Sequence, residues 1–449
     1  MLSLIATTIL TQGQIANQQL PNLQLAQGRV SKISAPLIPQ SIGNITPVHE
    51  LKTQSQWQPT TQENRPLCAV TVQVSKLCHR LKVLESRTAE LKAQQFSPTG
   101  TFSGEVLLGI SSAWGRDLDD SPVFQGSIEL EFNFSFTGED SLEVAIESGN
   151  AVDFSFVEEI TLEGRLGFTE STEDNRFEIS EFSYEFPLGE QIEVFISLSG
   201  DDLNDFNRFF EDGESGPISE FGGENSIHSL VEDAGIELKY EFNDTLTFGV
   251  GYYSEKAEKP EPGAGLFNGN FSVFAQVEFQ PSDNFLLGFT YIYNNNDSAL
   301  ETDTGSLRSQ INLERPVVGN SYGITTSFVP NSGVVIGGWV GFTEAEVIDL
   351  GEAYIWNYAF TLTLPDFGQE GNLLGFVIGQ EPRLTGTSGF LIDGRQNDPD
   401  VSLHLEAFYI YQVNDHISIT PGLIWITAPN HDNSNPDILV LTVRTTLEF

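Results

Sequence analysis

The residues of this sequence that could carry chemistry are mostly carboxylates, and several of them stand at alternate positions. In the run SIELEFNFSF, residues 127–136, Glu129 and Glu131 alternate with Ile128, Leu130 and Phe132. Because successive side chains of a strand point to opposite faces, the two carboxylates share one face. Carboxylate oxygens suit Ca²⁺, Mg²⁺ and hydrated iron, but the DxDxDG spacing of a calcium loop is absent. The pattern predicts a surface that attracts cations, with no defined metal site and no cofactor.

Nucleophilic catalysis is the competing chemistry. His404 lies on a strand-like run, with Ser402 and Glu406 two residues away on either side and on the same face. A serine hydrolase needs its histidine within hydrogen-bond reach of the nucleophile. Small polar residues that alternate along a strand are more simply the polar lining of a lumen. We therefore expect no enzymatic activity, with a hydrolase as the less favoured alternative.

Charge is distributed very unevenly along the 449 residues, which carry 63 acidic and 21 basic side chains and a formal net charge of −42. Residues 99–449 hold 59 of the acids and only 12 of the bases. Binding to nucleic acid requires clustered lysine and arginine, so nucleic acid is excluded as a partner. The chain has two distinct regions that meet near Pro98.

The larger region is predicted to be all-β. The sequence contains no run of 18 apolar residues that could cross a bilayer as a helix, whereas 41 glycines and 33 phenylalanines favour short strands and turns. Seven tight turns recur, at 137–140, 187–190, 243–244, 281–284, 330–333, 365–371 and 414–415. With one run at each end of residues 99–449, they predict sixteen strands.

Long polar segments separate the hairpins, near 113–122, 150–174, 200–231, 254–267, 294–318, 344–350, 385–400 and 427–437. Short turns at one end and long loops at the other are typical of transmembrane antiparallel β-barrels of the outer membrane. A strand-like run at 161–168 does not fit this scheme, so eighteen strands are the alternative. The last strand ends in Phe449, which we expect to act as an assembly signal.

Alternation also predicts which residues face the lumen of such a barrel, where rings of charge set selectivity. The predicted lumen wall comprises Glu129, Glu131, Glu143, Glu147 and Arg444. The segment 200–231 mixes acids with phenylalanines and is expected to fold, either into the lumen as a constriction or over the rim as a lid. Its candidate selectivity residues are Asp201, Asp202, Asp205, Arg208, Glu211, Asp212, Glu214 and Glu220.

The first 98 residues are predicted to form three parts. Residues 1–12 are apolar at the start and are expected to be a remnant of an export signal. Residues 13–66 are polar and lack periodicity, which predicts a disordered linker. Residues 67–95 carry a heptad pattern at Leu67, Val74 and Leu81 and at Val70, Leu77, Leu84 and Leu91, which predicts a periplasmic coiled coil. A helix packed on its own barrel is the alternative.

Several stretches resemble the cyanobacterial iron uptake porins of the OprB-type, carbohydrate-selective superfamily. They are residues 81–112, 215–222 (SGPISEFG), 265–289 (GLFNGNFSVFAQVEFQPSDNFLLGF), 318–342 and 355–386. The resemblance implies a homotrimer in the outer membrane that interacts with lipid and with the outer-membrane assembly machinery. Family members usually carry a wall-binding domain before the coiled coil, and none is recognisable here, so contact with peptidoglycan is left open.

The expected function is passive diffusion of small hydrophilic solutes, biased by an acidic lumen toward cations and inorganic ions such as iron. A carbohydrate-selective pore is the main alternative. A structural envelope protein is less favoured.

Overall fold

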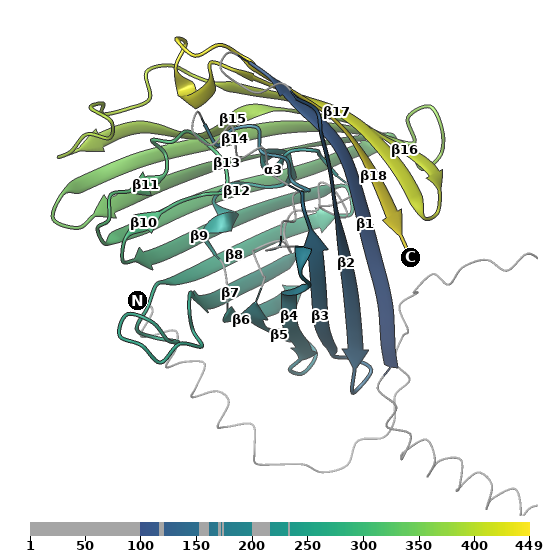
Figure 1. The fold of residues 1–449 in the computed structure, drawn as a ribbon. Coiled ribbons are helices and arrows are strands. Elements are labelled where there is room, and N and C mark those ends of the chain that lie inside the picture. The colour runs from purple at the N-terminus through teal and green to yellow at the C-terminus, as the bar shows by residue number, and fades with distance from the viewer. Residues whose placement is uncertain are drawn as a thin grey trace, which may run out of the picture. The chain divides into compact units, whose positions relative to one another are not determined.

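The computed structural model describes residues 99–115, 121–151, 161–168, 172, 175–199, 216–231 and 234–449. Within them sixteen antiparallel strands form a closed barrel, in which β1 pairs with both β2 and β18 (Figure 1). The prediction of sixteen strands is confirmed, and the eighteen-strand alternative is wrong. The predicted export signal, linker and coiled coil lie outside the described residues.

The barrel strands follow in chain order, with short helical turns and one small hairpin between them. They are β1 (Thr99–Trp114), β2 (Val123–Ser135), β3 (Ser141–Gly149), β4 (Glu178–Pro187), β5 (Ile192–Ser199), β6 (Ala234–Asn243), β7 (Leu246–Ser254), β8 (Phe271–Ser282), β9 (Phe285–Asn296), β12 (Val317–Asn331), β13 (Val334–Val347), β14 (Gly351–Pro365), β15 (Leu373–Ser388), β16 (Leu403–Asn414), β17 (Ile417–Thr427) and β18 (Ile438–Glu448). The separate hairpin is β10 (Ala299–Leu300) with β11 (Ile311–Asn312), and the helical turns are α3 (Glu220–Gly223), η5 (His228–Leu230) and η6 (Pro429–His431). No helix of the described residues is long and apolar enough to cross a membrane.

The predicted tight turns all join neighbouring strands at one end of the barrel, here called the turn end. The turn between β2 and β3 shows why such turns form. Asp140 Oδ1 accepts from the Thr137 amide at 2.6 Å, and Oδ2 accepts from the Tyr184 hydroxyl at 2.9 Å. Desolvation opposes ionisation, but hydrogen bonds from Thr137, Tyr184 and Ser135 outweigh it and hold the pKa of Asp140 well below its usual value.

The outer wall is apolar and carries a band of aromatic rings. Tyr322 lies 5.2 Å from Tyr291 and 6.3 Å from Phe342 between ring centroids, and Phe342 lies 4.7 Å from Trp356. Tyr322 and Trp356 are both exposed on the outside of the barrel. Aromatic residues in such a band mark a membrane–water interface.

The inside of the barrel is partly filled by its own loops. Two apolar clusters lie there, one around Phe168, Ile218 and Phe221 and the other around Ile227 and Leu300. Each cluster packs loop residues against inward-facing strand residues. The strand-like run at 161–168 belongs to this filling: it forms a single bridge, between Leu166 and Ser219, and no barrel strand.

Candidate functional site: the lumen of the barrel

Five glutamates on five consecutive strands form one row on the inner wall. Register pairs Glu448 of β18 with Glu105 of β1, Glu105 with Glu129 of β2, Glu129 with Glu147 of β3, and Glu147 with Glu178 of β4. This carboxylate row begins at the last residue of β18, at the turn end, and ends at the first residue of β4, at the opposite loop end. Neighbouring strands are about 4.8 Å apart, so the four steps of the row cover roughly 19 Å.

Like charges that face each other across a strand pair destabilise a sheet by about 0.2–1 kcal/mol each. A row of such pairs is therefore costly to the fold. The same wall carries further inward acids: Glu131 accepts from Ser103 Oγ at 3.0 Å, and Glu143 lies opposite Ser183. A basic group of this wall, Lys239 on β6, lies 3.6 Å from Glu193 on β5.

The predicted wall residues Glu129, Glu131, Glu143 and Glu147 thus all lie on the inner face. The row also contains three acids that were not among the predicted wall residues, Glu105, Glu178 and Glu448. A signal for Glu105 was present, because it shares the parity of Ser103 and Gly109 on β1. Glu178 could not be assigned in this way, because the regular alternation of inward and outward residues along β4 is interrupted. The pairing of β3 with β4 contains a bulge between Ala145 and Ile146.

The opposite part of the wall is covered by residues 216–231, here called the inner segment, which contains α3 and η5 (Figure 1). Phe221 packs edge-on against Trp339 at 5.7 Å, and Ile218 fills the space above Gly422. Trp339 is 2% exposed and faces inward, against the inner segment. The described part of the third long loop therefore lies inside the barrel.

Three charged wall residues anchor the inner segment and its neighbours. Glu406 accepts from the Ile218 amide at 2.6 Å and from the Ser219 hydroxyl. Arg444 donates to the carbonyl oxygens of Gly216 at 2.9 Å and Pro217 at 3.2 Å. Glu381 accepts from the amide of Gly164 at 3.0 Å and from the Thr304 hydroxyl. Each of these wall side chains thus binds a loop that is far from it in sequence.

Arg444 faces inward, but it is 1% exposed and its guanidinium lies 5.4 Å from the Phe168 ring. Three other arginines bind loops as well. Arg165 donates to Asp303 O at 2.7 Å, Arg308 pairs with Asp398 at 3.2 Å, and Arg383 donates to Asp398 O at 3.2 Å. These arginines therefore hold loops in place.

Seven of the eight predicted constriction residues lie outside the described residues: Asp201, Asp202, Asp205, Arg208, Glu211, Asp212 and Glu214. Glu220 is the first residue of α3, and its amide donates to Arg165 O at 3.0 Å. Their role in selectivity stays a prediction.

The histidine considered for catalysis is part of the anchoring network. His404 lies between Glu381, at 2.7 Å from Nδ1, and Glu406, at 3.3 Å from Nε2. Ser219 Oγ is 3.4 Å from His404 Nε2. However, Phe221 covers the imidazole ring, with 5.0 Å between the two ring centroids, and Ser219 and His404 are both at least 97% buried. Ser402, the predicted partner, instead donates its amide to His431. A substrate has no access to this group.

A closed sixteen-strand barrel with an apolar outer wall and a charged inner wall defines an outer-membrane channel. This chain belongs to the OprB family of carbohydrate-selective porins, whose model matches residues 67–449. An uncharacterized protein of Nostoc sp. is 32% identical over 412 residues, which cover 84% of this chain and 70% of that protein. A second, from Synechocystis sp., is 28% identical and covers 84% and 74%.

Solved structures share the fold at low sequence identity. A loop-deletion mutant of OmpT, an outer membrane protein of Vibrio cholerae, has a TM-score of 0.52 at 10% identity, covering 78% of this chain and 99% of that one. OprB of Pseudomonas putida has a TM-score of 0.50 at 11% identity, covering 80% and 96%.

Proposed function

We propose that this porin gives passive diffusion to small hydrophilic solutes and prefers cations, including inorganic ions such as iron. The carboxylate row carries this proposal, because it places one sign of charge at every step between the two ends of the barrel. A lumen lined by one sign of charge raises the local concentration of the opposite ion. The acids of residues 201–214 would add to this preference if they narrow the same lumen.

Planar-bilayer recording in a KCl gradient tests the proposal. The reversal potential should show cation preference, and the preference should fade as salt rises. The reason is that the screening length falls from about 10 Å at 0.1 M to about 3 Å at 1 M, below the spacing of the row. An anion preference, or a cation preference of equal size at both salt concentrations, would contradict it.

A carbohydrate-selective pore is the second candidate, favoured by one pocket. At the loop ends of β7, β8 and β9, a pocket of about 120 Å³ is lined by Tyr253, Glu255, Asn270, Asn294 and Glu301, among others. Amides, carboxylates and a tyrosine are groups that hydrogen-bond sugar hydroxyls. In the same recordings, a sugar that reduces the ion current with saturation would support this candidate, and a current independent of added sugar would oppose it.

For assembly, we propose a homotrimer with the coiled coil of residues 67–95 in the periplasm and Phe449 as the signal for the assembly machinery. The backbone of Phe449 pairs with Gly104 in both directions at 3.0 Å, which closes the barrel. One neighbour in structure, OmpT of Vibrio cholerae, is described in a trimer form.

The Cys78 thiol offers a test of the trimer, because it falls in the predicted coiled coil. In a Cys68→Ser variant, oxidative crosslinking through Cys78 should trap oligomers from detergent-solubilised protein. A Cys68→Ser, Cys78→Ser variant is the control. Exclusively monomeric product across detergent concentrations would count against the trimer.

A further inference from the structure

The inner segment follows the barrel wall across neighbouring strands, from β18 to β9. These strands stand side by side in the order β18, β17, β16, β15, β14, β13, β12, β9. Arg444 of β18 binds the carbonyl oxygens of Gly216 and Pro217 at the start of the segment. At its other end, Asn294 Nδ2 of β9 donates to the carbonyl oxygen of Leu230 at 2.6 Å. The segment is thus anchored to the wall at both ends.

Between the two anchors, four glycines of the wall lie directly beneath four side chains of the segment, in chain order. Gly422 of β17 lies beneath Ile218, Gly379 of β15 beneath Phe221, Gly341 of β13 beneath Asn225, and Gly323 of β12 beneath Ile227. These four glycines are here called the glycine seat. A β-carbon added at Gly323 would lie 2.7 Å from Ile227 Cδ1, whereas carbon atoms in ordinary contact are about 3.5–4.0 Å apart.

The four side chains on the glycine seat have no free space to move into, because each is at most 1% exposed. At Gly422 the three atoms nearest to an added β-carbon all belong to Ile218, so the whole side chain of Ile218 lies over the glycine and not only its tip. A rotation of that side chain therefore cannot make room for a methyl group. The segment itself would have to move.

Backbone geometry does not explain these glycines, since none of the four has a positive φ. Glycine weakens the interior of a strand and often marks a place where another part of the structure approaches closely. Another glycine of the inner wall, Gly288 of β9, shows the contrast. Its nearest neighbour is Thr325 Cβ, 3.8 Å from an added β-carbon, so a methyl group would fit there. Close approach of the inner segment is therefore the reason for the glycine seat.

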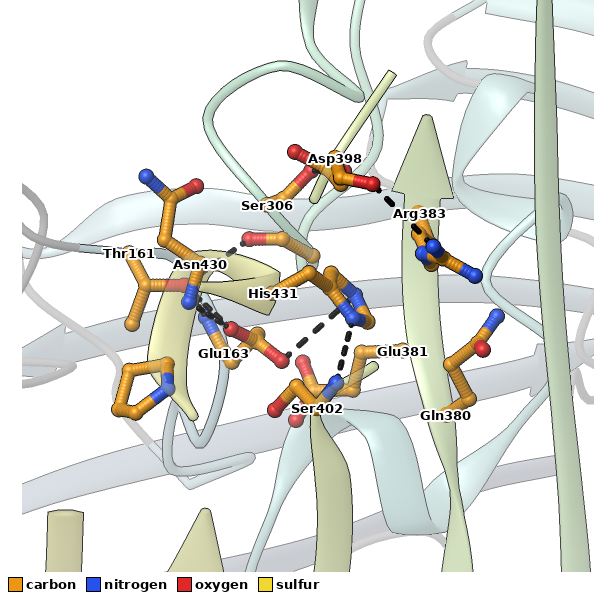
Figure 2. Close-up of polar contacts among 12 residues, drawn as sticks. Thr161, Glu163, Ser306, Gln380, Glu381, Arg383, Asp398, Ser402, Asn430 and His431 are labelled. Atoms are coloured by element: carbon orange, nitrogen blue, oxygen red, sulfur yellow. Dashed lines mark hydrogen bonds and ion pairs between the residues drawn. The ribbon is translucent and has the colours of Figure 1, made fainter. Parts of the chain in front are cut away.

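The loop segment 161–168 also holds the start of the inner segment. The Gly167 amide donates to the carbonyl oxygen of Ile218 at 3.0 Å. The loop segment is itself fixed at the loop end, where Glu163 accepts a hydrogen bond from the Asn430 amide in a buried polar cluster (Figure 2). The inner segment is therefore not free to slide along the wall.

The other face of the inner segment borders open space. Gly223 of α3 is partly exposed, and no atom lies within 4 Å of the position that its β-carbon would take. Glu220 and Glu224 beside it are partly exposed as well. The depth at which the segment lies on the wall therefore affects the width of the lumen.

We propose that the glycine seat determines the size cut-off of the channel, because it lets the inner segment lie deep against the wall and leaves the lumen wide. This inference rests on the proposed diffusion of hydrophilic solutes, but it concerns their size and not their charge. A methyl group at Gly422 or Gly323 requires roughly 1 Å more separation between wall and segment. Because the anchors at both ends remain, the segment should move into the lumen and not leave the wall.

Polymer exclusion in planar bilayers tests the glycine seat. In a Gly323→Ala, Gly422→Ala variant of the full-length porin, single-channel conductance is measured with neutral polyethylene glycols of graded size. The exclusion radius should be smaller than in the wild type by roughly 1 Å, and the conductance without polymer should fall. The reversal potential in a KCl gradient should keep its sign, because the carboxylate row is unchanged. Gly288→Ala is the matched control and should behave as wild type.

A compensating variant keeps the test decisive if the glycine variant does not fold. Ile218→Ala removes the three atoms nearest to a β-carbon at residue 422, so Gly422→Ala combined with Ile218→Ala should fold and return the exclusion radius towards the wild-type value. An unchanged or larger radius in the glycine variant would overturn the proposal. So would a radius in the compensated variant that stays as small as in Gly422→Ala. A reduced radius in a channel that prefers anions would support the glycine seat and contradict the proposed cation preference.

Discussion

In a Glu406→Leu variant the inner segment is expected to come away from the wall, and the single-channel conductance is expected to rise. Leucine is similar in size but accepts no hydrogen bond, so the Ile218 amide and the Ser219 hydroxyl lose their buried acceptor. A buried donor without a partner costs about 1–3 kcal/mol, so the docked segment should lose roughly 2–6 kcal/mol. The measurements are conductance in planar bilayers and hydrogen exchange of residues 216–231.

Glu406→Gln is the matched control for this experiment. Its amide oxygen can still accept from the Ile218 amide, so the increase in conductance should be smaller than for leucine. Arg444→Met should act in the same direction as Glu406→Leu, because the carbonyl oxygens of Gly216 and Pro217 lose their donors. Unchanged conductance and exchange in Glu406→Leu would mean that the apolar contacts of Ile218 and Phe221 alone hold the segment.

Neutralising the middle of the carboxylate row should lower the cation selectivity of the channel and raise the thermal stability of the barrel. In a Glu105→Gln, Glu129→Gln, Glu147→Gln variant, the reversal potential in a KCl gradient at low salt should move toward zero. At the same time the barrel should unfold at a higher temperature, because each facing pair of like charges that is removed relieves about 0.2–1 kcal/mol of repulsion. Lower selectivity with higher stability is the signature of residues kept for function.

A control with the same change in net charge separates the row from the general acidity of the chain. Glu139, Glu190 and Asp283 are exposed in the tight turns, away from the row. Their replacement by Gln, Gln and Asn should leave selectivity and thermal stability close to wild type. If the row variant instead keeps its cation preference, the filter must be assigned to the acids of residues 201–214, and Asn or Gln substitutions at Asp201, Asp202, Asp205, Glu211 and Asp212 should then abolish it.

The sequence by itself determined the strands, the tight turns and the face on which each strand residue lies. These features depend on a period of two and on turn residues such as Pro, Asn, Asp and Gly, which act over a few neighbouring residues. Glu129, Glu131, Glu143 and Glu147 could be placed on the inner wall for that reason. The count of sixteen strands followed from the seven turns together with one strand-like run at each end of residues 99–449.

The tertiary structure decided which inward residues meet. The row extends to Glu448 only because the last strand pairs with the first, and the partner of Glu105 on β18 depends on the register of that closure. Trp339 and Arg444 have the parity of lumen residues, yet both are covered, because the inner segment docks on their part of the wall. Glu163 and the Asn430 amide are 267 residues apart in sequence. Loop segments lack any period, so only the packing of their apolar residues and the burial of their polar groups determine where they lie.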